Sequence, residues 1–336
     1  MACMNRESLE GLLNRIGEAR VGLVGDVCLD MYWRADMRLS ELSRETPHHP
    51  LPVVEERMSP GGAGNVAWNL AALKPKALKT LGLIGRDWRG NLLTQALEER
   101  GVDASLLIRD ESVCTSTYIK PLRSGISDVV YEDPRIDFEN RRLPPARLEK
   151  ALLDALERVA GDVDVLLVSD QLAFGCVTAA VRERLCDLGR AGLVVAVDSR
   201  SRIGEYRNVI VKPNEVEAAR AFGGEADFDS LALAAARHTG RPAVLTVGGG
   251  GCLVAQGDRV VRLPAVPVPP PIDTVGAGDT FLAALGCALA AGGTVEQAAF
   301  TANLAASVTV RMLAITGAAT REAILRAFDC RQAGDA

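Results

Sequence analysis

Apolar runs and amphipathic segments alternate along most of this chain. Residues 20–25 form a continuous apolar stretch that predicts a buried parallel strand, and residues 5–19 before it have the spacing of an amphipathic helix. From residue 78 to residue 247 the alternation continues, which predicts an α/β fold with a doubly wound, mostly parallel sheet and helices on both faces. The further expected strands are 78–84, 104–108, 163–169, 193–197, 209–212 and 243–247, and the expected helices are 88–100, 144–160, 176–190, 214–222, 228–239, 277–291 and 294–311.

Two segments interrupt this alternation. Residues 31–60 hold four prolines and the β-branched pair Val53-Val54 without a helical period, and residues 112–135 are also strand-like. We expect both segments to form extended strands outside the main sheet and to pair into one small β-sheet that covers a site as a lid. Two independent surface loops are the alternative.

Length and composition indicate a globular chain with either one large domain and an appendage or two domains. We expect one domain over residues 1–330, followed by a tail, 331–336. The 336 residues are 48% hydrophobic and 24% charged, with a net charge of −5 and no basic patch, so neither nucleic acid nor an anionic membrane is expected as a partner. A small molecule fits better. The chain has no apolar run of the roughly 18 residues that a membrane span needs, and polar residues stand where a signal peptide would be apolar. We therefore expect a cytoplasmic protein.

The cysteines and histidines do not predict a metal centre. The eight cysteines form no C-x-x-C pair, and the three histidines have no metal-binding spacing, so reduced thiols are favoured over a disulfide framework or a zinc site.

Residues 273–280, DTVGAGDT, open an apolar helical run and form the most informative stretch. Small residues where a loop becomes a helix leave backbone N–H groups pointing outward, and the helix dipole adds positive charge, so the stretch predicts an anion pocket. The carboxylate of Asp279 would repel a phosphoryl group unless it accepts a proton, which suits a general base. An ordinary N-capped core helix is the alternative.

Polar and glycine-rich loops follow the first strand. Asp26 and Asp30 come after residues 20–25, where open α/β sheets carry ligand contacts, and their carboxylates could accept hydrogen bonds from sugar hydroxyls. A capping or turn role is the alternative for each. The stretch Gly61-Gly62-Ala63-Gly64-Asn65 precedes an apolar helix expected over 67–73, so its backbone could approach a ligand closely while Asn65 binds a hydroxyl.

Three later positions are candidates for a nucleotide site. In KPNEVE, Asn214 could cap a helix while Glu217 holds Mg²⁺ through water, although complementarity to the helix dipole would also explain this carboxylate. The run from Thr246 to Gly251 contains four consecutive glycines, and a nucleotide lying on this backbone explains them better than a compact turn does. Asn303, on a late helix, could face the base.

These motifs, in this order, resemble those of the ribokinase-like, or PfkB, carbohydrate kinases over residues 18–328. The match consists of GDVCLD, GGAGN, KPNEVE, TVGGGG and DTVGAGDT. Within that family the segments 24–33, 47–67 and 135–139 look most like the heptose 7-phosphate kinases. The resemblance implies a ribokinase-like fold with a small β-sheet lid, and phosphate transfer from ATP with Mg²⁺ to a sugar hydroxyl. The most similar members phosphorylate D-glycero-β-D-manno-heptose 7-phosphate to the 1,7-bisphosphate.

The resemblance also implies roles for individual residues. Asp279 would be the base, and the N–H groups of Gly276, Ala277 and Gly278 would form the anion hole. The remaining positions divide into sugar-binding residues (Asp26, Asp30, Gly61, Gly62, Asn65), residues that organise Mg²⁺ and ATP (Asn214, Glu217, Thr246, Gly248, Gly251, Asn303), and Asp273 with the backbone of Val275, where many relatives hold a monovalent cation such as K⁺.

Two departures from the heptose kinases keep other substrates open. Their Ser-Asp-Tyr-x-Lys-Gly segment is replaced by residues 169–175, SDQLAFG, which lack the lysine expected near a second phosphate; Arg44, His48 and His49 could substitute for it. No H-x-G-H of an adenylyltransferase is present, so we expect a kinase alone. A kinase for another sugar, sugar phosphate or nucleoside is the alternative, followed by a non-catalytic binding relative. A dehydrogenase is disfavoured, since no G-x-G-x-x-G follows the first strand. A homodimer joined through the lid is expected, because a small sheet has edges to cover.

Overall fold

A nine-stranded sheet forms the centre of the protein, whose computed structural model describes residues 4–223, 227–313 and 317–334. The strand order is β14-β13-β12-β11-β10-β9-β1-β4-β5, and every pairing from β12 to β5 is parallel. This confirms the expected mostly parallel α/β sheet. The strands are β1 (Arg20–Gly25), β4 (Ala77–Gly85), β5 (Leu107–Asp110), β9 (Val165–Asp170), β10 (Val194–Ser199), β11 (Ile210–Val211), β12 (Ala243–Thr246), β13 (Cys252–Gln256) and β14 (Arg259–Leu263).

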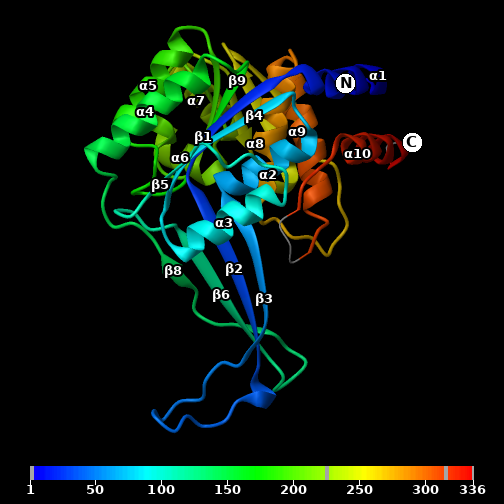
Figure 1. The fold of residues 1–336 in the computed structure, drawn as a ribbon. Coiled ribbons are helices and arrows are strands. Elements are labelled where there is room, and N and C mark those ends of the chain that lie inside the picture. Colours follow the sequence, from blue (N-terminus) through cyan, green and yellow to red (C-terminus); the bar gives the residue numbers. More distant parts are fainter. Residues whose placement is uncertain (1–3, 224–226, 314–316, 335–336) are drawn as a thin grey trace.

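Helices cover both faces of this sheet, as Figure 1 shows. One apolar core lies under α4, α5, α6 and α7, and the other lies under α1, α2, α8, α9 and α10. In α4, Leu148, Leu152, Leu156 and Val159 recur at helical spacing and are buried, so the amphipathic pattern specifies the face that packs on the sheet. The helices are α1 (Arg6–Arg15), α2 (Ala63–Leu73), α3 (Trp88–Glu98), α4 (Ala146–Ala160), α5 (Ala179–Arg190), α6 (Glu215–Phe222), α7 (Phe228–Thr239), α8 (Ala277–Ala290), α9 (Val295–Thr309) and α10 (Arg321–Gly334).

A second, five-stranded sheet projects from the core (Figure 1). Its central strand β2 pairs antiparallel with β3 and parallel with β6, so the two segments that interrupt the sequence alternation do form one small sheet. This sheet, called the lid below, consists of β2 (Val27–Asp36), β3 (Val53–Gly62), β6 (Thr117–Ser124), β7 (Tyr131–Glu132) and β8 (Ile136–Phe138).

Some boundaries differ from those expected. Helix α2 begins at Ala63 rather than at residue 67, because small residues are accepted in a first helical turn that packs closely on β2 and β3. The antiparallel strands β13 and β14 and the helix α10 were not predicted; each is short or weakly amphipathic, so its periodicity is a poor signal. Helix α10 continues to Gly334, so the expected tail is helical as far as this residue, and 335–336 lie outside the described residues.

The chain ends meet on one side of the core. Helices α1 and α10 lie side by side (Figure 1), and Arg6 pairs with Asp329 at 2.9 Å. Across the described ranges, no helix is both long and apolar enough to pass through a membrane.

Candidate active site

A pocket of about 970 Å³ opens at the carboxyl edge of the parallel strands, where open α/β sheets bind ligands. Strand β10 contributes Asp198, the residue after β11 is Lys212, and β12 ends at Thr246. The first turn of α8 closes the pocket with Gly278 and Asp279. The pocket therefore joins three of the sequence motifs, KPNEVE, TVGGGG and DTVGAGDT, that are far apart along the chain.

Asp279 lines this pocket, and the charge of Asp30 on lid strand β2 acts on it. Its Oδ2 accepts a hydrogen bond of 2.7 Å from the Nδ2 of Asn65 on α2. Burial raises the pKa of Asp279 to about 7, the Asn65 bond opposes this shift, and the negative charge of Asp198 adds to it. A carboxylate with a pKa near neutrality can accept a proton at pH 7, which is the property that a general base needs.

The turn before α8 differs from the expected anion hole. Gly276 caps the helix with a positive φ of 77°, which explains a glycine at this position. The N–H of Ala277, however, donates to the carbonyl of Thr274 at 3.2 Å, so it is not free to bind an anion in this conformation. In this conformation the turn uses the Ala277 donor, and the anion hole formed by the N–H groups of Gly276, Ala277 and Gly278 stays a prediction. Gly276 and Gly278 line the pocket.

Asp30 belongs to lid strand β2 rather than to a loop, and it contacts Gly61 on β3 closely. A Cβ built at Gly61 would lie 2.4 Å from the Asp30 Oδ2, so only glycine leaves room for this carboxylate. Burial raises the pKa of Asp30, while the cations of Lys120 and Arg135 oppose the shift. Gly62 has a φ of 54° and approaches the Asp26 carbonyl, where a side chain would clash at 2.5 Å.

Asp26 has a structural role that the sequence did not reveal. It is 3% exposed, and its carboxylate accepts hydrogen bonds of 2.8–2.9 Å from the backbone N–H groups of Gln171, Leu172 and Cys176. Burial raises the pKa of Asp26 to about 6, although these bonds favour the ionised form. Because the carboxylate is occupied by the loop after β9, the structure does not support the expected contact with a sugar.

Asn214 and Glu217 form a capping box at the start of α6. The Asn214 side chain accepts from the Glu217 N–H at 2.8 Å, and the Glu217 carboxylate accepts from the Asn214 N–H at 2.9 Å. Both residues line the pocket. Burial and the negative charge of Asp198 raise the pKa of Glu217. The helix cap that the sequence predicted at Asn214 is therefore confirmed. Its partner Glu217 supplies a carboxylate to the pocket lining.

The glycine-rich run after β12 lines the same pocket. Thr246 bonds the carbonyl of Pro213 with its backbone N–H at 3.0 Å and with its hydroxyl at 3.3 Å, which joins two neighbouring loops. Gly251 has a φ of 91°, and a Cβ there would lie 2.2 Å from the Leu263 carbonyl. Gly248 also lines the pocket. The tight turn thus leaves bare backbone along one wall of the pocket, which is suited to a flat ligand.

Asn303 lines the pocket, but its amide is engaged with the protein. The Nδ2 donates to the Leu263 carbonyl at 3.1 Å and lies 3.5 Å from the sulfur of Cys252, and the residue is 8% exposed. These contacts tie α9 to β13 and β14. The donor is therefore not free to bind a base in this conformation.

The residues expected to hold a monovalent cation form a turn of their own. The Asp273 carboxylate accepts from the Val275 N–H at 2.9 Å, and the Asp273 N–H donates to the Val310 carbonyl at 2.9 Å. In the part of the chain that the structure describes, no group of three or more His, Cys, Asp or Glu side chains could hold a metal ion.

Among the charged pocket residues to which the sequence analysis gave no role are Lys212, Asp198 and Arg200. Lys212 forms a buried ion pair of 3.0 Å with Asp198, and its ammonium group faces Gly278 on α8. Burial alone would lower the pKa of Lys212, but Asp198 and Glu217 outweigh it, so the pKa is raised. Arg200, just after β10, also lines the pocket. A Lys in KPNE and an Asp at the end of an apolar strand were visible signals, although only the fold brings them together.

The three residues proposed to replace the missing lysine do not reach this pocket. Arg44, His48 and His49 are exposed and lie between the outer ends of β2 and β3, at the far end of the lid from the core. None of them lines the pocket. Their proximity to Pro50 in sequence suggested a place near the site, but the length of the lid strands carries them away from it.

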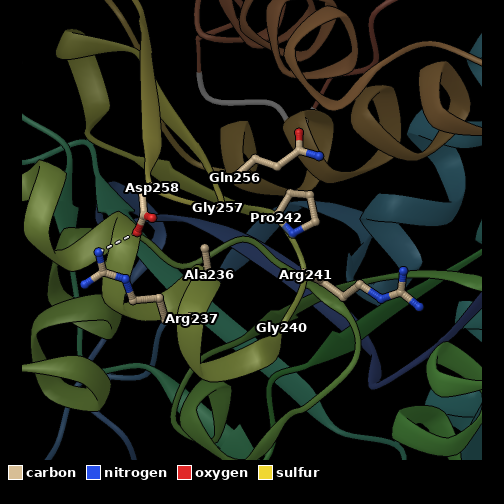
Figure 2. A pocket seen from close by; sticks show the side chains of 8 residues that line it. All are labelled: Ala236, Arg237, Gly240, Arg241, Pro242, Gln256, Gly257 and Asp258. Carbon is tan, nitrogen blue, oxygen red and sulfur yellow. Dashed lines mark hydrogen bonds and ion pairs between the residues drawn. The ribbon is translucent and has the colours of Figure 1, made fainter.

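A second, smaller hollow of about 390 Å³ lies away from these residues, and Figure 2 shows its lining. It is formed where α7 ends and β13 turns into β14. Arg237 and Asp258 pair across one side of it at 2.8 Å. The hollow contains none of the sequence-predicted residues.

Comparison with known proteins identifies the family. The profile described as pfkB family carbohydrate kinase matches residues 29–318. The chain therefore belongs to the pfkB family of carbohydrate kinases, and the expected enzyme class is confirmed.

Curated relatives are about one-third identical to this chain over the residues that align. The bifunctional protein HldE of Citrifermentans bemidjiense is 34% identical over 331 residues, which are 96% of this chain and 66% of the relative. HldE of Caulobacter vibrioides is 36% identical over 305 residues, 87% of this chain and 60% of the relative. The chain thus spans about two thirds or less of the length of these relatives.

Solved structures share the fold. Arabidopsis thaliana ribokinase complexed with ribose and ATP has a TM-score of 0.67 at 20% identity. The superposition covers 92% of this chain and 98% of the ribokinase chain. A putative sugar kinase from Clostridium perfringens has a TM-score of 0.71 at 17% identity, covering 93% and 96%. These similarities confirm the ribokinase-like fold.

Proposed function

We propose that this protein transfers the γ-phosphate of ATP to a hydroxyl of a sugar phosphate. The observation on which the proposal rests is the position of Asp279, which lies at the junction of the lid and the large pocket, bonded to Asn65 and near Lys212. The sugar would lie under the lid beside Asp30 and Asn65. ATP would occupy the wall formed by Asn214 and the glycine-rich turn.

Each group has a defined task in this reaction. Asp279 takes the proton of the attacking hydroxyl, and its pKa near 7 lets it do so at neutral pH. The ammonium of Lys212 and the N-terminus of α8 stabilise negative charge on the transferring phosphoryl group. Glu217 holds water ligands of Mg²⁺, an ion that neutralises phosphate charge when it is bound. Positioning and charge stabilisation of this kind supply most of the catalysis in phosphoryl transfer.

D-glycero-β-D-manno-heptose 7-phosphate is the substrate that we propose, with the 1,7-bisphosphate of ADP-heptose biosynthesis as product. The similarity to HldE proteins over nearly the whole chain and the heptose-kinase-like segments of the sequence support this choice. Arg200, Lys120 and Arg135 are cations near the sugar side that could bind the second phosphate. A kinase for another sugar or nucleoside is the second candidate, because a ribokinase with bound ribose shares the fold.

The substrate is tested by ADP release with Mg-ATP and one acceptor at a time. The panel is heptose 7-phosphate, fructose 6-phosphate, ribose, fructose and adenosine. Turnover on the heptose phosphate alone is the expected result. Turnover confined to an unphosphorylated acceptor would overturn the heptose assignment and retain the kinase. We also propose a monovalent cation at Asp273 and Val275, and a solved phosphofructokinase-2 of the same fold is in complex with potassium. Repeating the assay with KCl replaced by a tetraalkylammonium salt tests this proposal.

We also propose that two copies join through their lids, in the cytoplasm where ATP is available. The lid bears exposed apolar side chains, and its outer strands have free edges, which a second copy would cover. A dimer mass in solution that becomes a monomer mass in Leu42→Asp is the expected result, whereas a wild-type monomer at micromolar concentration would contradict it. The exposed apolar side chains of the lid and its loops include Leu39, Leu42, Val53, Val54, Val129, Val130 and Tyr131.

A further inference from the structure

A buried chain of hydrogen bonds runs from the helix α8 to the proposed base through α2. The Thr280 hydroxyl bonds the Asn69 Oδ1 at 2.9 Å, and the Asn69 Nδ2 lies 3.3 Å from the Asn65 Oδ1. The Asn65 Nδ2 then donates to Asp279 at 2.7 Å. Asn65, Asn69 and Thr280 are each no more than 2% exposed. Thr280 and Asn69 have no contact with the pocket, since neither lines it.

The hydrogen-bond partners of Asn69 determine the orientation of both side-chain amides in this hydrogen-bond chain, those of Asn69 and Asn65. One end of the Asn69 side chain faces the backbone carbonyls of Asn65, at 3.0 Å, and Gly317, at 3.4 Å. Carbonyl oxygens only accept, so this end must be the NH₂ group. The other end is then the oxygen, which requires the Thr280 hydroxyl to donate to it.

The same logic determines the orientation of Asn65. Its oxygen faces the Asn69 NH₂ group, so its own NH₂ group must face Asp279. Without Asn69, only Asp279 would distinguish the two ends of the Asn65 amide, and it favours the NH₂ end only while it is ionised. A flipped amide would present oxygen to Asp279 and would bond the protonated carboxyl instead of the carboxylate.

We propose that Asn69 and Thr280 are positioning residues for phosphate transfer: they hold the Asn65 amide so that its N–H group faces the carboxylate of Asp279. The inference rests on the proposed role of Asp279 as base. It adds two residues outside the pocket to the machinery of the site. Their effect on the reaction passes through Asn65.

Asn69 and Thr280 therefore influence how the reaction rate depends on pH. The N–H bond from Asn65 favours the ionised Asp279 and so lowers its pKa against the effect of burial. Other charges face Asp279 from the surrounding elements: Asp198 on β10, Lys212 after β11 and Asp30 on β2 act on its titration, and Glu217 on α6 and Arg200 after β10 line the same pocket. Because those groups stay in place in Asn69 and Thr280 variants, a change in the pH profile reports on the amide.

The test compares the pH profiles of kcat in variants of nearly unchanged shape. Asn69→Leu has nearly the shape of Asn69 and adds no charge, but it cannot donate to Asn65, so the Asn65 amide is no longer held in one orientation. We expect the pH midpoint of its rate to rise by about one unit and kcat at pH 7 to fall roughly tenfold, as the loss of one charge-assisted hydrogen bond implies. The KM for ATP should stay unchanged. Thr280→Val should shift the midpoint in the same direction by less, and Thr280→Ser, which keeps the hydroxyl, should restore it.

Thr301→Val is the matched control. Thr301 is fully buried on α9, and its hydroxyl bonds the Gln297 carbonyl of its own helix at 2.9 Å, so its loss should leave the midpoint unchanged. A folded Asn69→Leu variant with the wild-type midpoint and kcat would overturn the inference. If the Asn69 variant does not fold, equal midpoints in Thr280→Val and Thr280→Ser would overturn it as well. Wild-type protein without kinase turnover would instead overturn the proposed function.

Discussion

The ammonium of Lys212 lies 3.0 Å from the Asp198 carboxylate, and both residues line the pocket that Asp279 also lines. The pair is almost enclosed, with side-chain exposures of 4% for Lys212 and 11% for Asp198. The two opposite charges cancel, so the pair has no net charge at the place where phosphate would bind.

Lys212→Met should lower stability and activity together. Removing one partner of a buried ion pair leaves the other charge uncompensated, which costs about 3–5 kcal/mol. Adding Asp198→Leu should recover most of the unfolding temperature, because the lone carboxylate is removed, while the kinase rate stays low for want of the cation. A double variant with a normal rate would show that Lys212 does not act on the phosphate.

Asp279 should make the protein less stable as the pH rises. Its folded pKa of about 7 lies above the ordinary value of 3.8, so between these values the folded state holds a proton that the unfolded state has lost. Stability therefore falls through this window and is lowest above pH 7. Asp279→Asn carries no such charge, so its unfolding temperature should exceed that of the wild type by an amount that grows from pH 5 to pH 8. A difference that is constant with pH would contradict the raised pKa.

Gly61→Ala should weaken sugar binding while sparing ATP. The new Cβ would lie 2.4 Å from the Asp30 carboxylate and push it away from the position in which it can accept hydrogen bonds from a sugar. Loss of one charged hydrogen bond predicts a rise of about tenfold or more in the KM for the sugar. Gly11→Ala on α1 is the control, because its Cβ would meet only the Arg15 side chain at 3.7 Å. An unchanged KM for the sugar would contradict the assignment of Asp30 to the sugar-binding site.

Asp26→Ala should unfold more easily without a specific defect in sugar binding. Three backbone N–H groups of the loop after β9 would lose their acceptor in a buried place, at about 1–3 kcal/mol each. Asp26→Asn keeps one oxygen and should be intermediate. Thermal unfolding and the sugar KM measured on the same samples separate the two roles. A normal unfolding temperature with a raised KM would restore the sugar-binding interpretation.

The sequence predicted the helices and strands, and the order of the site motifs along the chain, better than it predicted the contacts between site residues. Apolar runs specified the parallel sheet, and the lid pairing followed from two extended segments that had no helical period. Asp26 and Asp30 follow the same strand in sequence, yet the Asp26 carboxylate is hydrogen-bonded to the loop after β9 and Asp30 lies in a lid strand beside Gly61. Their difference depends on tertiary packing, which no local pattern records.

Contacts between distant segments explain the other gaps. Asn69 and Thr280 are 211 positions apart, and each alone is an ordinary polar residue in an apolar helix. Lys212 becomes part of the site only because β10 and β11 are neighbours in the sheet. The N–H of Ala277 was expected to be free, but a turn to Thr274 binds it, which depends on the φ and ψ angles that the chain adopts there.

The most direct test of the account is the kcat of Asp279→Asn for ADP release with Mg-ATP and heptose 7-phosphate, alongside the binding of both ligands. The account predicts a fall of at least about a hundredfold in kcat, as expected when a general base is lost, with ATP affinity and folding retained. A variant that turns over near the wild-type rate would contradict the assignment of Asp279 as the base.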